Sequence, residues 1–129
     1  MILVDADFYI GLFHNEDAHN DQCRRIFPKI KENIITTWDV VDEVTTKLLY
    51  FNKKEIAVNF VASMLKADKY LVWPNHELLT LALKILIKQK NKHVSFTDCM
   101  NMAVAKEKNI EYLLSFDKNY EKNGFKLFK

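Results

Sequence analysis

The chain has 129 residues, of which 49% are hydrophobic and 28% are charged, about the length of one domain. With half of its residues apolar, it can bury a core without disulfides or structural metals. Only two Gly and two Pro are present, which argues against a turn-rich all-β sandwich or barrel. The net charge of +2 excludes little by itself, but residues 1–83 carry a net −3 and residues 84–129 a net +5.

Nothing in the sequence indicates export or membrane insertion. No segment approaches ~18 uninterrupted apolar residues, the length that a spanning helix needs. The first residues, MILVD, meet a carboxylate at once and do not resemble a secretory signal. Cys23 and Cys99 match no metal-ligand spacing and are too few for a disulfide framework. We therefore expect a cytoplasmic protein with reduced thiols and no contact with a membrane.

The N-terminal third predicts a strand followed by two helices. Residues 2–4 form a short apolar run that indicates a buried strand, and the apolar positions of residues 8–13 indicate a short helix. After a polar turn, Asp17 is a candidate cap for a second helix that would run towards Glu32. Pro28 should kink this helix or end it early.

The middle of the chain predicts a strand and a helical hairpin. Residues 34–37 are β-branched and indicate a second strand. Apolar residues recur at helical spacing over residues 41–49 and 56–65, with a short break at residues 51–53. The two helices should therefore form an αα-hairpin.

The C-terminal half continues the alternation of strands and helices. Its predicted elements are a strand over residues 70–73 that Pro74 ends, a helix over 78–86, a helix from Ser95 to about 108, and strands over 112–116 and 125–128. Short strands that are apolar on both faces and alternate with helices are typical of a parallel sheet. We therefore predict an α/β fold with three layers, in which a parallel sheet of four or five strands is flanked by helices. Residues 1–129 should form one domain.

Four carboxylates are candidates for chemistry. In open α/β sheets, sites form beyond the carboxyl ends of the strands, where Asp5 and Asp117 fall. Glu43 and Asp98 complete the set. Each also has a purely structural explanation: Asp5 and Asp117 could cap the helical segments that follow them, Glu43 could pair with a lysine one turn later, and Asp98 has capping-box spacing from a serine. Spacing alone does not decide between these explanations and a site.

The sequence motifs resemble those of the PIN-domain family, specifically its VapC-like toxin branch. The matching segments are MILVDADFYIGLF, NEDAHND, WDVVDEVTTKLL and HVSFTDCMNMAVAKEKNIEYLLSFDKNYEKNGF, which together span nearly the whole chain. The order and spacing of these segments are more specific than any one of them. The resemblance implies a PIN-like fold and a nuclease.

The resemblance also implies the roles of particular residues. It places acidic catalytic and metal-binding residues at Asp5, Glu43, Asp98 and Asp117. It indicates three supporting polar side chains, Thr97, Asn101 and Ser115. Asp7 departs from the family pattern, which usually has a small polar residue there. Asp7 could join the site or point to solvent from the start of the helix, and we expect the second.

A cluster of carboxylates predicts a bound cation, because the negative charges repel one another unless a proton or a cation neutralises them. Oxygen-only ligands favour Mg²⁺ or Mn²⁺, as one ion or as two ions that clamp the attacking and leaving oxygens. The expected reaction is hydrolysis of an RNA phosphodiester that leaves a 5′-phosphate and a 3′-hydroxyl. Lys90 and Lys92, in a basic run ahead of the Asp98 motif, are candidates for binding the RNA backbone.

The resemblance implies a toxin of a toxin–antitoxin pair, with a housekeeping RNA-processing nuclease as the alternative. A cognate antitoxin would bury an apolar patch and place Arg or Lys in the carboxylate cluster, and a homodimer could form through the αα-hairpin. Two other classes stay open: a non-catalytic module that binds RNA or protein, and a phosphatase of the haloacid-dehalogenase kind. The phosphatase is disfavoured because the Asp-x-Asp of VDADF lacks the usual Thr two residues later.

Overall fold

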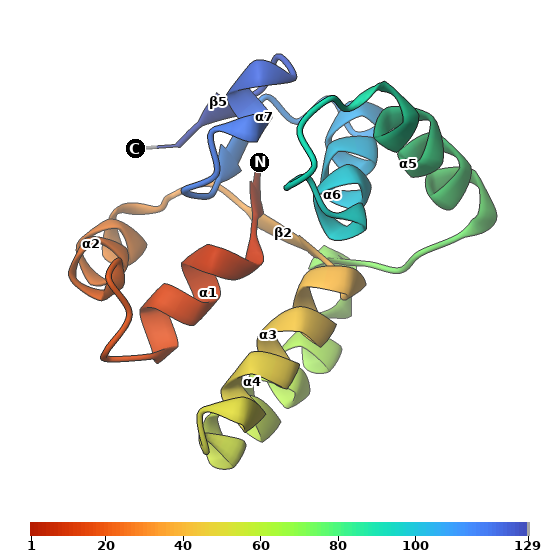
Figure 1. The fold of residues 1–129 in the computed structure, drawn as a ribbon. Coiled ribbons are helices and arrows are strands. Elements are labelled where there is room, and N and C mark those ends of the chain that lie inside the picture. The colour runs from red at the N-terminus through yellow and green to blue at the C-terminus, as the bar shows by residue number, and fades with distance from the viewer. Residues whose placement is uncertain (129) are drawn as a thin grey trace.

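Five parallel strands form the sheet of this protein in the computed structural model, which describes residues 1–128 (Figure 1). The strands are β1 (Ile2–Val4), β2 (Ile34–Thr37), β3 (Leu71–Val72), β4 (Tyr112–Leu114) and β5 (Lys126–Leu127). Their order is β3-β2-β1-β4-β5, so β1 is central. Ile2 lies opposite Ile34 on one side and Tyr112 on the other.

Helices connect and cover the strands. They are α1 (Ala6–Phe13), α2 (Asn20–Ile26), α3 (Trp38–Tyr50), α4 (Lys54–Lys66), α5 (His76–Lys88), α6 (Phe96–Glu107) and α7 (Asn119–Lys122), with 3₁₀ turns at Phe27–Lys29 and Asp68–Tyr70. Figure 1 shows α3 and α4 as an antiparallel hairpin, with α1 and α2 on one side of the molecule and α5 and α6 together on the other. None of the helices in residues 1–128 is long and apolar enough to cross a bilayer.

The sheet separates two apolar cores because side chains alternate between its faces. On β1, Ile2 and Val4 pack into the core with α1, α3 and α4, whereas Leu3 packs into the core with α5 and α6. The predicted parallel sheet flanked by helices in three layers is thus confirmed, with five strands.

The second predicted helix starts later than expected and ends early, as Pro28 predicted. The second helix begins at Asn20 and ends at Ile26. Asp17 does not cap this helix, because its Oδ1 accepts from the backbone N–H of His19 and closes the preceding turn. Pro28 lies in a 3₁₀ turn, since proline cannot donate the backbone hydrogen bond that would continue the α-helix.

The predicted strands over residues 70–73 and 112–116 are also shorter in the structure. β3 covers two residues and β4 covers three. Beyond β4, the backbone N–H of Phe116 donates to Asp7 Oδ2, and Ser115 contacts Asp5 and Asp7 through its Oγ. The end of β4 is therefore shaped by side-chain contacts and not by strand pairing.

The connectivity places a crevice next to β1. The chain builds β1, β2 and β3 outward in one direction and then adds β4 and β5 on the opposite side of β1. The order of the strands therefore reverses between β1 and β4. Ligands of open α/β sheets bind at such a reversal, outside the carboxyl ends of the strands. Asp5 follows β1 there, and Ser115 to Asp117 follow β4.

Candidate acidic site at the carboxyl edge of the sheet

Asp5 is the centre of the site. It caps α1, and its Oδ1 accepts from the backbone N–H of Ala6 at 2.8 Å and from Nδ2 of Asn101 at 3.1 Å. Its Oδ2 lies 2.9 Å from Oγ of Ser115 and 3.0 Å from the Tyr120 hydroxyl. The side chain is only 5% exposed. Four polar groups around one buried carboxylate hold both of its oxygens in position.

Asp7 belongs to the same site, which corrects the expectation that it points to solvent. Its Oδ2 lies 3.0 Å from Oγ of Ser115 and accepts from the backbone N–H of Phe116 at 2.9 Å. Its Oδ1 is buried and has no hydrogen-bond partner. The first turn of α1 begins directly at the end of β1, so Asp7 faces the end of the neighbouring β4.

Asp98 serves the helix and the site at once. Its Oδ2 accepts from the backbone N–H of Ser95, and Oγ of Ser95 accepts from the N–H of Asp98, which completes the expected capping box. Its Oδ1 lies 3.2 Å from the hydroxyl of Tyr120. One oxygen thus caps α6, while the other faces the cluster around Asp5.

Asn101 ties three elements to this cluster. It lies on α6 one turn after Asp98 and is fully buried. Its Nδ2 donates to Asp5 Oδ1 and, at 3.0 Å, to the Tyr120 hydroxyl. Its Oδ1 accepts from Oγ1 of Thr37 at 2.9 Å, and Thr37 caps α3. Asn101 thus contacts the carboxylate of Asp5, and its supporting role at a metal site stays a prediction.

The hydroxyl groups cannot supply all of the protons that these contacts need. The Tyr120 hydroxyl carries one hydrogen but lies within hydrogen-bond distance of both Asp5 and Asp98. Ser115 also carries one hydroxyl hydrogen and contacts both Asp5 and Asp7. Two hydrogens for four carboxylate contacts leave a deficit. The carboxyl groups must hold protons themselves, or a cation must take their place.

The pKa values change in the direction that this deficit requires. Burial, and then the charges of Asp7 and Asp98, raise the pKa of Asp5 to about 8. Burial is also the largest cause of the raised pKa values of Asp7 and Asp98, and the charge of Asp117 adds to both. Negative charge is thus concentrated where it is poorly solvated.

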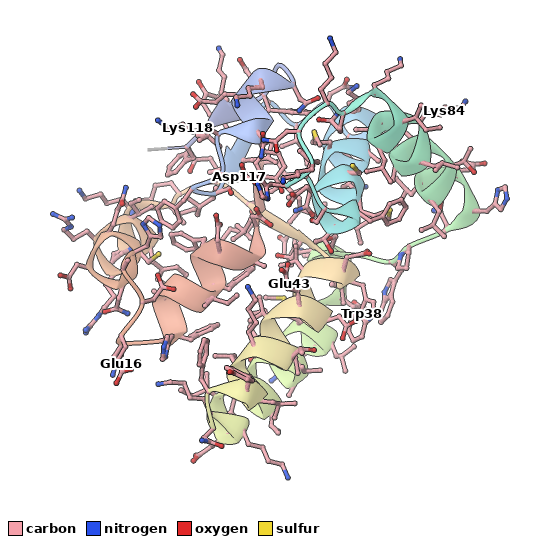
Figure 2. The ribbon with its side chains drawn as sticks, viewed as in Figure 1. Glu16, Trp38, Glu43, Lys84, Asp117 and Lys118 are labelled. Atoms are coloured by element: carbon pink, nitrogen blue, oxygen red, sulfur yellow. The ribbon has the colours of Figure 1, made fainter. Side chains whose placement is uncertain are left out.

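The remaining predicted residues, Asp117, Glu43 and Thr97, lie near the cluster but do not complete a ring of ligands around its centre. Asp117 accepts from the backbone N–H of Asn119. Burial raises the pKa of Glu43, which Lys47 lowers and Asp98 raises further. Glu43 lines a cavity of about 260 Å³ together with Thr97. Figure 2 shows Glu43 on α3 and Asp117 ahead of α7, both near the centre of the molecule.

The donor set fits a hard divalent cation. Within residues 1–128, no three His, Cys, Asp or Glu side chains already lie in a geometry that would hold a metal ion. The candidate ligands are nevertheless carboxylate oxygens, as Mg²⁺ and Mn²⁺ prefer. The unpartnered Oδ1 of Asp7 and the proton deficit both indicate a missing positive charge. Small side-chain movements would have to draw the acids around the ion.

Sequence reasoning missed Tyr120, which contacts Asp5, Asp98 and Asn101 although it is only 1% exposed. The signal was weak: a single aromatic residue three positions after Asp117, in an otherwise polar segment. Lys90 and Lys92 are exposed in the loop between α5 and α6. Their role in RNA binding stays a prediction.

Comparison with protein families and curated sequences gives a consistent result. The model of the PIN domain family matches residues 2–126. Two curated proteins named 23S rRNA-specific endonuclease VapC20, from two strains of Mycobacterium tuberculosis, are each 26% identical over 125 residues. The alignments cover 97% of this chain and 95% of each relative.

Solved structures share the fold. The crystal structure of Mycobacterium tuberculosis VapC20, a Sarcin-Ricin loop cleaving toxin, matches with a TM-score of 0.84 and 22% identity over 97% of this chain and 96% of that one. FitAB bound to an IR36 DNA fragment matches with a TM-score of 0.77 and 14% identity, over 99% and 94% of the two chains. FitAcB from Neisseria gonorrhoeae matches with a TM-score of 0.73 and 14% identity, over 100% and 97%.

Proposed function

The chain belongs to the PIN-domain family, and from this membership together with its acidic site we propose that it is a metal-dependent endoribonuclease that acts as the toxin of a toxin–antitoxin pair. The observation that carries the proposal is the group of carboxylates at the reversal of strand order, in which Asp5 is buried and four polar groups contact it. A group of acids with too few protons is suited to bind cations and, through them, a phosphodiester.

The proposed reaction is hydrolysis of an RNA phosphodiester to a 5′-phosphate and a 3′-hydroxyl. Asp5, Asp7 and Asp98 would hold the divalent cation, with Asp117 and Glu43 completing its surroundings. A bound Mg²⁺ or Mn²⁺ would supply an activated water and stabilise charge on the phosphate oxygens. One ion or two would serve this chemistry.

The chain's own polar residues would keep the acids in position. Asn101 and Tyr120 hold the carboxylate of Asp5 from α6 and α7, and Ser115 holds it from the end of β4. Each contact comes from a different part of the chain, so the position of Asp5 depends on the whole fold. Such fixed placement lowers the cost of arranging the site when substrate binds.

Cleavage of a defined RNA tests the proposal. Because curated relatives are named for 23S rRNA, we propose ribosomal RNA as the first substrate to test. Purified protein is incubated with it in Mg²⁺, in Mn²⁺ and in EDTA. Asp98→Asn keeps the side-chain size but removes the charge, whereas Asp68→Asn removes an exposed charge outside the site and serves as the control.

We expect the wild type and Asp68→Asn to cleave RNA only when the metal is present, and Asp98→Asn to lose at least 100-fold in rate, as expected when a transition-state interaction worth ~3 kcal/mol is removed. The chemistry of the product ends is determined by ligation, because an RNA ligase joins only ends that carry a 5′-phosphate and a 3′-hydroxyl. Equal cleavage by Asp98→Asn and wild type would reject the assigned site. RNA binding that EDTA leaves unchanged, without any cleavage, would favour the non-catalytic module.

An apolar groove is the proposed docking place of the antitoxin. The groove has a volume of about 790 Å³ and lies between α1 and α4. Aromatic and aliphatic side chains line it, among them Tyr9, Phe13, Phe60 and Met64. Its shape suits the apolar face of a partner helix, which would bind as in other helix-in-groove complexes. A basic side chain from that partner could then reach the acids and take the place of the cation.

The housekeeping nuclease differs from the toxin in its cellular effect. Expression of the toxin alone should arrest growth of the native host, and coexpression with a partner encoded next to it should restore growth. Harmless expression without any partner would favour the RNA-processing role. A homodimer is a further proposal, which sedimentation of the purified chain would test.

A further inference from the structure

A second cavity lies beside the acidic site, on its α2 side. It has a volume of about 400 Å³ and runs along the carboxyl ends of β4 and β5. Its apolar lining comes from Leu114, Phe116, Leu127 and Phe128. Ser115 also lines it, and the same serine contacts Asp5 and Asp7. Ser115 therefore borders both the cavity and the acids.

Three cations from two separate segments converge on this cavity. Arg25 comes from the last turn of α2, and Lys29 comes from the 3₁₀ turn that follows. Lys118 comes from the segment between β4 and α7, and Figure 2 shows it on the α2 side of α7, next to Asp117. We call these three residues with their cavity the basic cavity.

The cations are free to bind an anion. In the part of the chain that the structure describes, the one ion pair joins Lys126 to Glu111, outside the basic cavity. Glu121 also lines the cavity, so the four charged side chains leave a net positive charge. This positive surface borders the acids. Two of its cations, Arg25 and Lys29, come from the first 83 residues, which as a whole carry a net negative charge.

A purely structural explanation covers only part of this arrangement. A basic residue in the last turn of a helix interacts favourably with the free carbonyl groups there, which is sufficient for Arg25. It does not explain why Lys118, from a segment more than 80 residues later, lines the same cavity. Two independent segments that supply cations to one hollow indicate an anionic ligand.

We propose that the basic cavity binds a backbone phosphate of the RNA substrate, next to the phosphodiester that is cut. This inference rests on the proposed function. Ser115 lines the cavity and contacts Asp5 and Asp7, so the cavity lies beside the acids, where a phosphate next to the one that is cut could bind. Arg25, Lys29 and Lys118 would neutralise this phosphate. The apolar side chains of the lining suit the attached sugar or base.

The basic cavity differs from the site that the sequence indicated for the RNA backbone. Lys90 and Lys92 belong to the loop between α5 and α6, on the other side of α7 from α2 (Figure 1). The two proposals therefore direct the RNA strand to opposite sides of the acids. Separate variants can distinguish them.

The experiment measures RNA binding as a function of salt, in EDTA so that the RNA stays intact. The probe is a fluorescein-labelled RNA of mixed sequence, followed by anisotropy. The variants are Arg25→Ala/Lys29→Ala and Lys118→Ala. The control, Lys66→Ala/Lys106→Ala, removes two exposed last-turn cations of α4 and α6, which precede β3 and β4 at the opposite, amino edge of the sheet.

Each lost phosphate contact should reduce the slope of log K against log salt by about 0.7, the value for single strands. Because the basic cavity would hold one phosphate, we expect the slope to fall by up to about 0.7 in Arg25→Ala/Lys29→Ala and in Lys118→Ala alike, with weaker binding in both. The control should keep the wild-type slope. Lys118→Arg should also keep it, because it preserves the charge.

In the cleavage assay with Mg²⁺, the basic-cavity variants should raise KM and leave kcat close to the wild-type value. An equal loss of slope in the control would show that only total charge matters and would overturn the inference. Wild-type slopes in all variants, with the wild type cleaving RNA normally, would overturn the inference alone. If the wild type neither binds nor cleaves any RNA, the proposed function fails and the inference fails with it.

Discussion

Replacing Tyr120 with phenylalanine removes one buried hydroxyl and tests whether it holds the acidic site together. This hydroxyl lies 3.0 Å from Asp5 Oδ2 and 3.2 Å from Asp98 Oδ1, and it accepts from Asn101 Nδ2 at 3.0 Å. The ring itself stays, so the packing around it changes little. Any effect then comes from the lost hydrogen bonds.

The expected loss of stability follows from counting those bonds. The hydroxyl has one hydrogen, so it can donate to only one carboxylate at a time, and a bond to a charged group contributes about 1.5–3 kcal/mol. Asn101 loses one acceptor, which costs about 1 kcal/mol more. Tyr120→Phe should therefore lower the free energy of unfolding of the metal-free protein by about 2–4 kcal/mol.

Urea unfolding at pH 7 in EDTA measures this difference. Tyr112→Phe is the matched control, because Tyr112 is 39% exposed at the start of β4, and surface changes usually stay within about 0.5 kcal/mol. A loss for Tyr120→Phe no larger than that of the control would refute the role assigned to the hydroxyl. In the cleavage assay we expect the variant to keep metal dependence and to lose about tenfold in kcat, corresponding to about 1.4 kcal/mol.

Further predictions concern pH, metal, packing and the partner. The pKa of Asp5 is raised to about 8 in the folded protein, so between pH 4 and 8 the folded state binds a proton that the unfolded state has lost. The free energy of unfolding without metal should therefore fall as pH rises through this range. Urea titrations that show a rise would contradict this prediction. Millimolar Mg²⁺ should raise the melting temperature of the wild type at pH 8 and raise it less in Asp98→Asn, and equal shifts would place the ion elsewhere. Gly11→Ala should cost about 1–3 kcal/mol in urea unfolding, because its Cβ would lie 2.7 Å from Sγ of Cys23 where α1 packs on α2. Met64→Glu should weaken binding of the coexpressed antitoxin in a pull-down without changing RNA cleavage, and unchanged binding would exclude the apolar groove.

The sequence determined the layers of the fold and most of its elements. Apolar strands without alternation, as at residues 2–4, must be buried on both faces, and this requirement alone predicts a parallel sheet covered by helices. The capping box at Ser95 was also readable, because its spacing is local. The cap predicted at Asp17 was wrong because a short turn competes closely with a helix start, whereas the early end predicted at Pro28 was confirmed.

The sequence also indicated which acids to consider, but not how they are held. Asp5 and Asp117 could be singled out because each follows a strand. Their structural and functional explanations turned out to be compatible, as with Asp98, whose two oxygens have different partners. Asp98 can therefore cap the helix with one oxygen and face the cluster with the other.

Only the tertiary structure decided the composition of the site. Tyr120 is 115 residues from Asp5 and Asn101 is 96 residues away, and nothing local in the sequence records that all three meet. The direction of Asp7 likewise depends on how β4 ends beside α1. Burial, proton sharing and the basic cavity are properties of groups that separate segments bring together. Local periodicity determines the elements, whereas the pKa values and partners of the acids depend on distances in space that the folded chain alone defines.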